Sequence, residues 1–141
     1  MNAIESSNRA RMLSVYAAFA DGHLDPLFDV LDENVEWVVS APREFFRFGG
    51  TFRGRAGLKE YTALLFLDFH FTRFAPRATI AAGDQVWATF AVEVFHRASK
   101  KHFPLDITVM WTMKNGRLLA HRCVFDTAQA LLQMGELPTA A

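Results

Sequence analysis

In the stretch Met110-Trp-Thr-Met-Lys-Asn-Gly-Arg-Leu-Leu-Ala-His121, an Asn-Gly pair separates two segments rich in β-forming residues. Asn-Gly favours a two-residue type I′ turn, so the sequence predicts a β-hairpin in which Lys114 lies opposite Arg117. Counting outward from this turn pairs Met110 with His121, Thr108 with Cys123, and Asp106 with Phe125. Because side chains alternate between the two faces of a strand, all these residues would share one face of the sheet.

Further strand and helix signals precede and follow this hairpin. β-Branched and aromatic residues separated by turn signals predict consecutive antiparallel strands over 74–81, 86–96, 103–113 and 118–126, after an earlier strand over 35–39. Apolar residues at helical spacing predict helices over 8–20, 25–32, 56–68 and 127–134. Helices followed by a meander of strands indicate an α+β fold, with the N-terminal helices packed on a curved antiparallel sheet.

The length and composition of the chain limit the classes of protein to which it can belong. The chain has 141 residues, with 15 Lys and Arg against 15 Asp and Glu. This length fits one domain over 1–141, in which we expect 1–7 to be loosely ordered and 136–141 to form a tail. A formal charge of zero argues against nucleic acid as a partner, and no apolar run approaches the roughly 20 residues that span a membrane. The single cysteine suits a reducing compartment, so the sequence favours a cytoplasmic protein.

The expected register divides the sheet into a mixed face and an aliphatic face. The mixed face carries Trp87, Thr89, Glu93, Asp106, Thr108, Met110, His121, Cys123 and Phe125. The aliphatic face carries Phe90, Val92, Val94, Ile107, Val109, Trp111, Ala120, Arg122 and Val124. We expect the mixed face to curve beneath the helices and line a pocket, while the aliphatic face packs against a second copy of the chain. The alternative interpretation swaps the faces, so that the aliphatic face forms the core.

Three residues of the mixed face are candidates for acid–base chemistry. His121 titrates near neutral pH and could exchange a proton with a ligand, although it could also be a buried histidine satisfied by a neighbour. The simplest pairing sets Glu93 opposite Asp106. If both carboxylates were shielded from water, their repulsion would raise the pKa of one of them, which could then act as a general acid or base. The alternative is that both belong to a solvated cluster of salt bridges. The expected substrate contacts are Tyr16, Trp37, Trp87, Thr108, Met110, Cys123 and Phe125.

Two further patterns concern cofactors and partners. The five histidines form no His-x-x-x-His pair, so we expect neither a metal nor another cofactor. The segment 41–57 holds four of the eight glycines and four phenylalanines, Phe45, Phe46, Phe48 and Phe52. Four aromatic residues in such a loop must cover something, either the mouth of a pocket or a dimer contact.

Several segments taken together carry a resemblance to a known family. They are Val15-Tyr-Ala-Ala-Phe-Ala-Asp-Gly-His-Leu-Asp25, Val35-Glu-Trp-Val-Val39, Gly50-Thr-Phe-Arg-Gly54, Gly57-Leu-Lys-Glu-Tyr61, Gly83-Asp84 and Gly116-Arg-Leu-Leu-Ala-His-Arg-Cys-Val-Phe-Asp126. They resemble the SnoaL-like branch of the nuclear transport factor 2-like (NTF2-like) superfamily, which has a cystatin-like α+β fold. The resemblance covers nearly the whole chain and implies a cone of helices over a bent sheet, with an internal pocket and often a dimer. Ketosteroid isomerases, polyketide cyclases and limonene-epoxide hydrolases share this fold.

The catalytic groups of these relatives are largely replaced in this chain. The three acid–base positions of ketosteroid isomerases correspond to Val39, Val15 and Thr108, and the base of limonene-epoxide hydrolases corresponds to Cys123. The ending Leu131-Leu-Gln-Met-Gly-Glu-Leu-Pro138 is similar to the tail of SnoaL-type cyclases. We therefore expect a protein with a pocket for a hydrophobic small molecule. It is either a cofactor-independent isomerase, cyclase or hydrolase, in which His121 with Asp106 or Glu93 moves a proton, or a non-catalytic homodimer that binds an apolar molecule.

Overall fold

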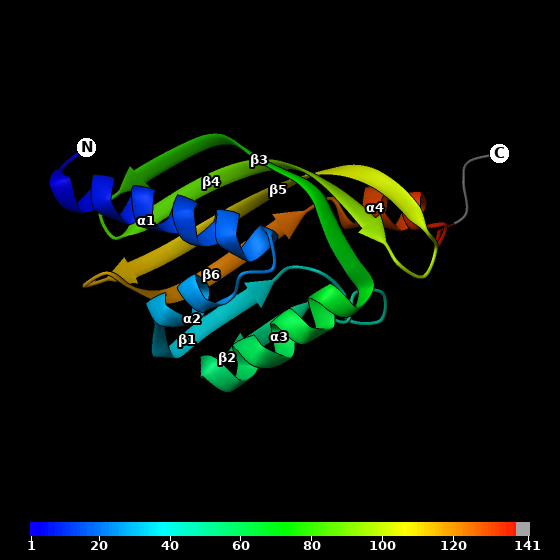
Figure 1. Cartoon of the computed structure of the whole chain (residues 1–141), viewed down its shortest axis with the longest axis horizontal. Coiled ribbons are helices and arrows are strands. Elements are labelled where there is room, and N and C mark those ends of the chain that lie inside the picture. Colours follow the sequence, from blue (N-terminus) through cyan, green and yellow to red (C-terminus); the bar gives the residue numbers. More distant parts are fainter. Residues whose placement is uncertain (138–141) are drawn as a thin grey trace.

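The computed structural model describes residues 1–137 and has the predicted α+β architecture (Figure 1). Its elements are α1 (Ala3–Ala20), α2 (Asp25–Val30), β1 (Leu31–Val39), β2 (Gly50–Arg53), α3 (Gly54–Asp68), β3 (Phe69–Ala82), β4 (Gln85–His96), β5 (Lys101–Lys114), β6 (Arg117–Phe125) and α4 (Thr127–Met134). All predicted helices and strands are present, and β2 is an additional short strand inside the Gly-rich segment. The last four residues of the predicted tail, 138–141, lie outside the described residues.

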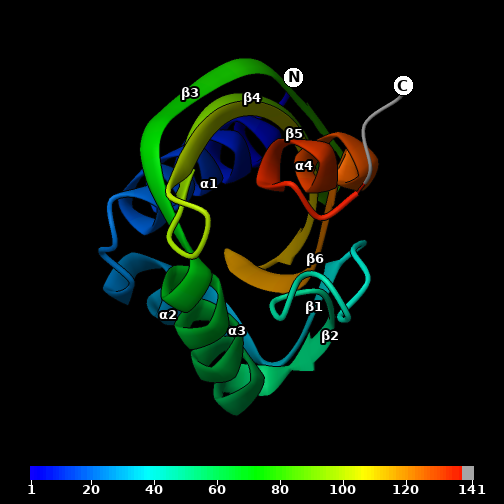
Figure 2. The same ribbon diagram turned by 90° about the vertical axis from the view of Figure 1, so that its right-hand side faces the viewer.

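The six strands form one sheet in the order β2-β1-β6-β5-β4-β3. Neighbouring strands are antiparallel, except that β1 and β6 pair in parallel. Figure 2 shows that the sheet bends through a wide arc without closing, with α1 and α3 on its concave side and α4 at one end. None of the helices within residues 1–137 combines the length and the hydropathy needed to cross a membrane.

The first helix begins earlier than predicted. Asn2 caps α1 by accepting a hydrogen bond from the backbone N–H of Glu5, and the Glu5 carboxylate accepts one from the backbone N–H of Asn2, both at 2.8 Å. This reciprocal capping box satisfies two free donors of the first turn. The same carboxylate also accepts a bond of 2.7 Å from the backbone N–H of Gly83, which ties α1 to the turn between β3 and β4. Residues 3–7, which we expected to be loosely ordered, are therefore helical.

The β5–β6 hairpin has the predicted turn but not the predicted register beyond it. Asn115 and Gly116 both have positive φ, 52° and 74°, as a type I′ turn requires, and Lys114 lies opposite Arg117. Leu119 is then an extra residue, because the next pairs are Met113 with Leu118 and Thr112 with Ala120. This β-bulge shifts β6 by one residue, so that the following pairs are Trp111 with His121, Val109 with Cys123 and Ile107 with Phe125. The predicted pairs with Met110, Thr108 and Asp106 are wrong.

The bulge moves His121 and Cys123 to the face that carries the aliphatic residues of β5, because a slip of one residue exchanges the faces. Between β4 and β5 the register differs from the predicted one by two residues. Because side chains alternate with a period of two, each residue of these strands stays on its predicted face of the sheet. Glu93 lies opposite Pro104, and Asp106 lies opposite Ala91. The residues of β4 and β5 that belong to the predicted aliphatic face are buried in the core, as the alternative interpretation expected. They are Phe90, Val92, Val94, Ile107, Val109 and Trp111.

Candidate functional site

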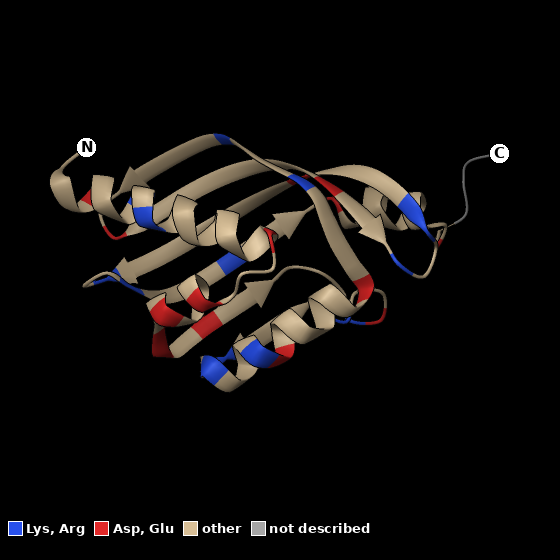
Figure 3. Ribbon diagram, in the orientation of Figure 1, with Lys and Arg blue, Asp and Glu red and all other residues tan. Residues whose placement is uncertain are grey.

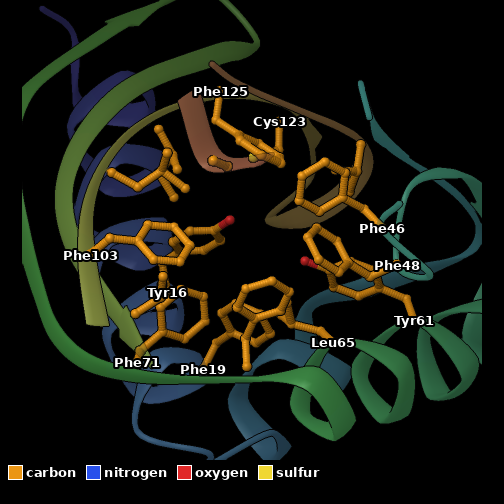
Figure 4. Close-up of a pocket in the computed structure, with 16 residues that line it drawn as sticks. Tyr16, Phe19, Phe46, Phe48, Tyr61, Leu65, Phe71, Phe103, Cys123 and Phe125 are labelled. Atoms are coloured by element: carbon orange, nitrogen blue, oxygen red, sulfur yellow. The ribbon is translucent and has the colours of Figure 1, made fainter. Parts of the chain in front are cut away.

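A cavity lies between the concave face of the sheet and the helices (Figure 4). Its free volume is about 50 Å³, which is less than the roughly 300–1,000 Å³ of pockets that hold drug-sized ligands. The lining residues are Tyr16, Phe19, Val39, Phe46, Phe48, Tyr61, Leu65, Phe69, Phe71, Val94, Phe103, Leu105, Ile107, Cys123, Phe125 and Ala130. They include no Asp, Glu, Lys, Arg or His, so the walls are apolar and uncharged.

Three polar groups belong to the lining: the hydroxyls of Tyr16 and Tyr61 and the thiol of Cys123. Tyr16 lies on α1 in an apolar stripe with Met12 and Phe19, and Tyr61 lies on α3 in a similar stripe. Figure 4 shows both hydroxyl oxygens pointing from opposite helices toward the centre of the cavity. Among the described lining residues, a ligand in this space would therefore meet two hydroxyl groups and the weakly hydrogen-bonding thiol of Cys123.

The Tyr16 hydroxyl contacts a histidine that does not itself line the cavity. Its oxygen lies 3.4 Å from Nε2 of His121 on β6, and both side chains are buried. The parallel pairing of β1 with β6 places Trp37 beside His121, and their rings stack with centroids 3.4 Å apart and planes 7° apart. Nδ1 of His121 has no hydrogen-bond partner of normal geometry among the described residues. Tyr16 thus connects the cavity to a buried imidazole that has one free nitrogen.

Burial keeps all the polar groups of this site neutral. It lowers the pKa of His121 from 6.5 to about 3, and the backbone carbonyls of Val38 and of His121 itself only partly oppose this shift. It raises the pKa of the Cys123 thiol to about 12 and the pKa values of the Tyr16 and Tyr61 hydroxyls above their ordinary range. Near pH 7 the site therefore holds a neutral imidazole, two phenols and a thiol, but no carboxylate base.

The segment between β1 and β2 covers one side of the cavity. Phe46 and Phe48 are buried and pack edge-on against each other, with ring centroids 5.7 Å apart. The Arg43 guanidinium donates a hydrogen bond of 2.7 Å to the carbonyl of Gly49, and Arg47 forms a salt bridge with Asp68 at the end of α3. These contacts hold the two phenylalanines over the cavity, which is one of the two roles we expected for residues 41–57.

The sequence-predicted site residues fall into three groups. Tyr16, Cys123 and Phe125 line the cavity. Trp37 and His121 do not line it but contact the lining residues Tyr61 and Tyr16. Trp87, Thr108, Met110, Glu93 and Asp106 lie on the outer face of the sheet, away from the cavity.

The predicted register therefore placed the carboxylates of Glu93 and Asp106 wrongly, because they face solvent and not the cavity. Glu93 is exposed, and Asp106 forms a salt bridge of 3.4 Å with Arg77 on the surface, where its side chain is 70% exposed. The solvated alternative describes them better than a shielded acid–base pair does. Tyr61 is the polar lining residue that was not predicted, although it stands on the apolar stripe of α3 with Leu58 and Leu65.

Metal binding has little support in the side chains present. Within residues 1–137, no three His, Cys, Asp or Glu side chains come close enough together to hold a metal ion. The lining offers hydroxyl, thiol and aromatic groups, which suit an organic ligand better than a cation.

The bent, unclosed sheet with helices on its concave side defines the class of NTF2-like α+β proteins. The sequence model of the SnoaL-like domain family matches residues 13–121, so the chain belongs to this family, as the resemblance implied. No curated protein sequence matches the chain.

Solved structures agree with this assignment. TerC, co-crystallised with polyporic acid, is 28% identical and superposes with a TM-score of 0.79 over 92% of this chain and 98% of its own. An NTF2-like protein of unknown function from Burkholderia pseudomallei is 21% identical, with a TM-score of 0.81 over 91% of this chain and 97% of its own. A candidate isomerase from Rhodopseudomonas palustris is 20% identical, with a TM-score of 0.78 over 89% of this chain and 94% of its own.

Proposed function

We propose that this SnoaL-like domain binds a neutral, hydrophobic small molecule in the cavity between the sheet and the helices. The observation that carries the proposal is the composition of the walls, where aromatic and aliphatic side chains surround two converging hydroxyls (Figure 4). Small-molecule sites have this character: a mostly apolar lining with a few polar groups that fix the orientation of the ligand.

The absence of charge from the lining argues for a neutral ligand. Moving an ion out of water is costly unless an opposite charge receives it, and no lining residue carries one. The chain has 15 basic and 15 acidic residues, and Figure 3 shows segments of both signs distributed over the fold, so the net charge favours neither kind of ion. A hydrophobic ligand gains free energy simply by leaving water for these walls.

The comparison with TerC supports a ligand-binding role. TerC has the same fold, covers 92% of this chain and was crystallised with polyporic acid, a small molecule. The free volume of about 50 Å³ means that lining side chains must move when a ligand of even benzene size enters. Phe46 and Phe48 are two of these lining side chains, and they lie in the segment between β1 and β2 rather than in a helix or strand.

A binding experiment with a matched pair of variants tests the proposal. Toluene is the probe, titrated against the protein by NMR or calorimetry. Cys123→Phe would place a ring in the cavity, whereas Val124→Phe places the same ring on the opposite face of the same strand. We expect wild type and Val124→Phe to bind toluene and Cys123→Phe to lose binding while remaining folded by circular dichroism. Wild-type protein that does not bind toluene would contradict the proposal.

A second candidate function is proton transfer on the bound molecule, as in an isomerase, cyclase or hydrolase without a cofactor. The contact of 3.4 Å between Tyr16 and Nε2 of His121 favours it, because Tyr16 could pass a proton between a ligand oxygen and the imidazole. In this scheme Tyr16 touches the ligand and His121 acts through it. If a molecule that co-purifies is converted by the protein, Tyr16→Phe should abolish conversion and retain binding. Equal turnover in this variant would leave the binding role alone.

We also propose that the chain forms a homodimer through the outer face of the sheet. Ile80, Trp87 and Met110 are cross-strand neighbours on β3, β4 and β5, and the first two are 67% and 48% exposed. An apolar row of this kind on one sheet face suits a second copy of the same face. Light scattering should give the mass of a dimer for wild type and for Ile4→Glu, a change at an exposed site on α1, and of a monomer for Trp87→Glu. For location, the single buried cysteine favours the cytoplasm.

A further inference from the structure

Residues 41–49, which we call the flap, form a part of the cavity wall that differs from the rest. Among the described lining residues, Phe46 and Phe48 lie in this segment, and all the others belong to the sheet or to α1, α3 and α4. Figure 4 shows both rings reaching the cavity from the flap. Because the free volume is about 50 Å³, a ligand of benzene size enters only if part of the wall moves.

The backbone of the flap is hydrogen-bonded to itself. The N–H groups of Phe45 and Phe46 donate to the carbonyl of Pro42 at 3.2 and 2.9 Å, and the N–H of Gly49 donates to the carbonyl of Phe46 at 2.9 Å. The Arg43 side chain donates to the carbonyl of Gly49 at 2.7 Å. Within residues 1–137, the backbone bonds of residues 41–49 all stay between 39 and 49. The flap can therefore move without breaking the ladder of the sheet.

The two ends of the flap lie against each other. A Cβ on Gly49 would be only 2.3 Å from the carbonyl oxygen of Ala41, so the first and last residues of the flap are in close contact. The next residue, Gly50, has a φ of 95°, in the region that favours glycine. A compact loop with close ends and internal bonds turns as a unit about its ends. Ala41 and Gly50 are thus the positions about which the flap would turn.

Two kinds of contact hold the flap against the rest of the protein. On the inside, Phe48 packs against the rings of Phe69 and Phe125, with centroids 5.6 and 6.3 Å away. On the outside, Nε of Arg47 donates a hydrogen bond of 3.0 Å to one carboxylate oxygen of Asp68, the last residue of α3, and Nη2 contacts the other oxygen. In the described part of the chain, this bidentate pair is the ion pair that joins the flap to another element.

Building on the proposed function, we propose that the flap is the gate of the cavity and that Arg47 and Asp68 form its latch. The flap turns outward, the ligand enters past Phe46 and Phe48, and the salt bridge then forms again behind it. Neither Arg47 nor Asp68 lines the cavity. The latch therefore stabilises the closed state equally with and without ligand, so it slows entry and exit by the same factor and leaves the affinity unchanged.

The rates of toluene exchange, measured by NMR, test the latch. The proteins compared are wild type, Arg47→Gln, Asp68→Asn and the control Arg53→Gln. Arg53 forms a salt bridge of 2.6 Å with Glu36 between β2 and β1, so the control removes an exposed ion pair outside the flap. We expect both latch variants to raise the entry and exit rates about threefold, with a Kd within about twofold of wild type, and the control to behave as wild type.

Salt gives a second measurement that needs no variant to be well folded. The Arg47 side chain is 54% exposed, so 1 M NaCl screens the pair and should speed exchange in wild type. Arg47→Gln at the same salt concentration shows how salt affects toluene itself, and its rates should rise less than those of wild type.

The outcomes separate this inference from the proposed function. If toluene binds but both latch variants and wild type in high salt exchange at the original rate, the latch is refuted and the binding site stands. A faster exit with unchanged entry would show that the pair stabilises only the bound state, which also overturns the latch. If wild type does not bind toluene, the proposed function fails and the gate fails with it.

Discussion

His121 should make the protein less stable in mildly acidic solution, and the size of this effect follows from its burial. In the unfolded chain its pKa is near 6.5, and in the folded chain it is about 3. Below pH 6.5 the unfolded state therefore binds a proton that the folded state cannot accept, and the free energy of unfolding falls as the pH falls toward 3. Above pH 6.5 neither state is protonated, so the residue contributes no pH dependence there.

The magnitude can be worked out from these two values. At pH 5 the solution lies about 1.5 units below the unfolded pKa, and each unit corresponds to about 1.4 kcal/mol, so the loss is about 2 kcal/mol. Urea unfolding followed by tryptophan fluorescence at pH 7.5 and pH 5 measures it, with His121→Gln as the reference. The other four histidines are unchanged in this variant and cancel in the comparison.

Wild type should lose about 2 kcal/mol more than His121→Gln between these two pH values. An equal loss in both proteins would show that His121 accepts a proton in the folded state, either because the site admits water or because a carboxylate reaches it. That result would refute the neutral, dry site on which the proposed binding of a neutral, hydrophobic ligand depends.

The remaining predictions concern the segment over the cavity and the outer face. Phe48→Leu should lower the free energy of unfolding by about 1 kcal/mol and strengthen binding of ethylbenzene relative to toluene, because it enlarges the cavity; equal effects on both probes in calorimetry would contradict this. Gly49→Ala should destabilise the protein by about 2 kcal/mol or more in urea unfolding, since a Cβ there would collide with the carbonyl oxygen of Ala41. Glu93→Gln and Asp106→Asn should change stability by less than about 0.5 kcal/mol and leave toluene affinity unaltered; a loss of binding would mean that an outer carboxylate acts on the cavity.

The sequence predicted the elements of the fold well because their signals are local. The Asn-Gly turn, the apolar stripes of the helices and the aromatic and β-branched runs each specify a structure within a few residues. The last helix, over Thr127–Met134, was predicted to the residue because Asp126 caps it and Gly135 ends it with φ of 81°. The start of α1 was missed because its capping box lies at Asn2 and Glu5, before the apolar stripe begins.

The short strand β2 was missed for a different reason. Its four residues, Gly50–Arg53, have no alternating pattern long enough to indicate a strand. They become one because β1 has a free edge, and Trp37 and Phe52 lie opposite each other across it. Pairing of this kind depends on a neighbour that is supplied by the tertiary structure, so the local sequence does not determine it.

The candidate site was predicted only in part. Which residues of β6 face the cavity depends on the register between β5 and β6, and one bulged residue changes that register. Without the bulge at Leu119, His121 would lie opposite Met110 on the outer face, where solvent would keep its pKa near the ordinary value. With it, His121 lies opposite Trp111, stacked on Trp37 and in contact with Tyr16. The same slip separates His121 from Asp106 and Glu93, which stay in solvent. One extra residue therefore replaces a charged acid–base cluster with a neutral imidazole behind a tyrosine, and this makes uncharged hydrogen bonding, rather than a carboxylate base, the chemistry that the cavity can offer.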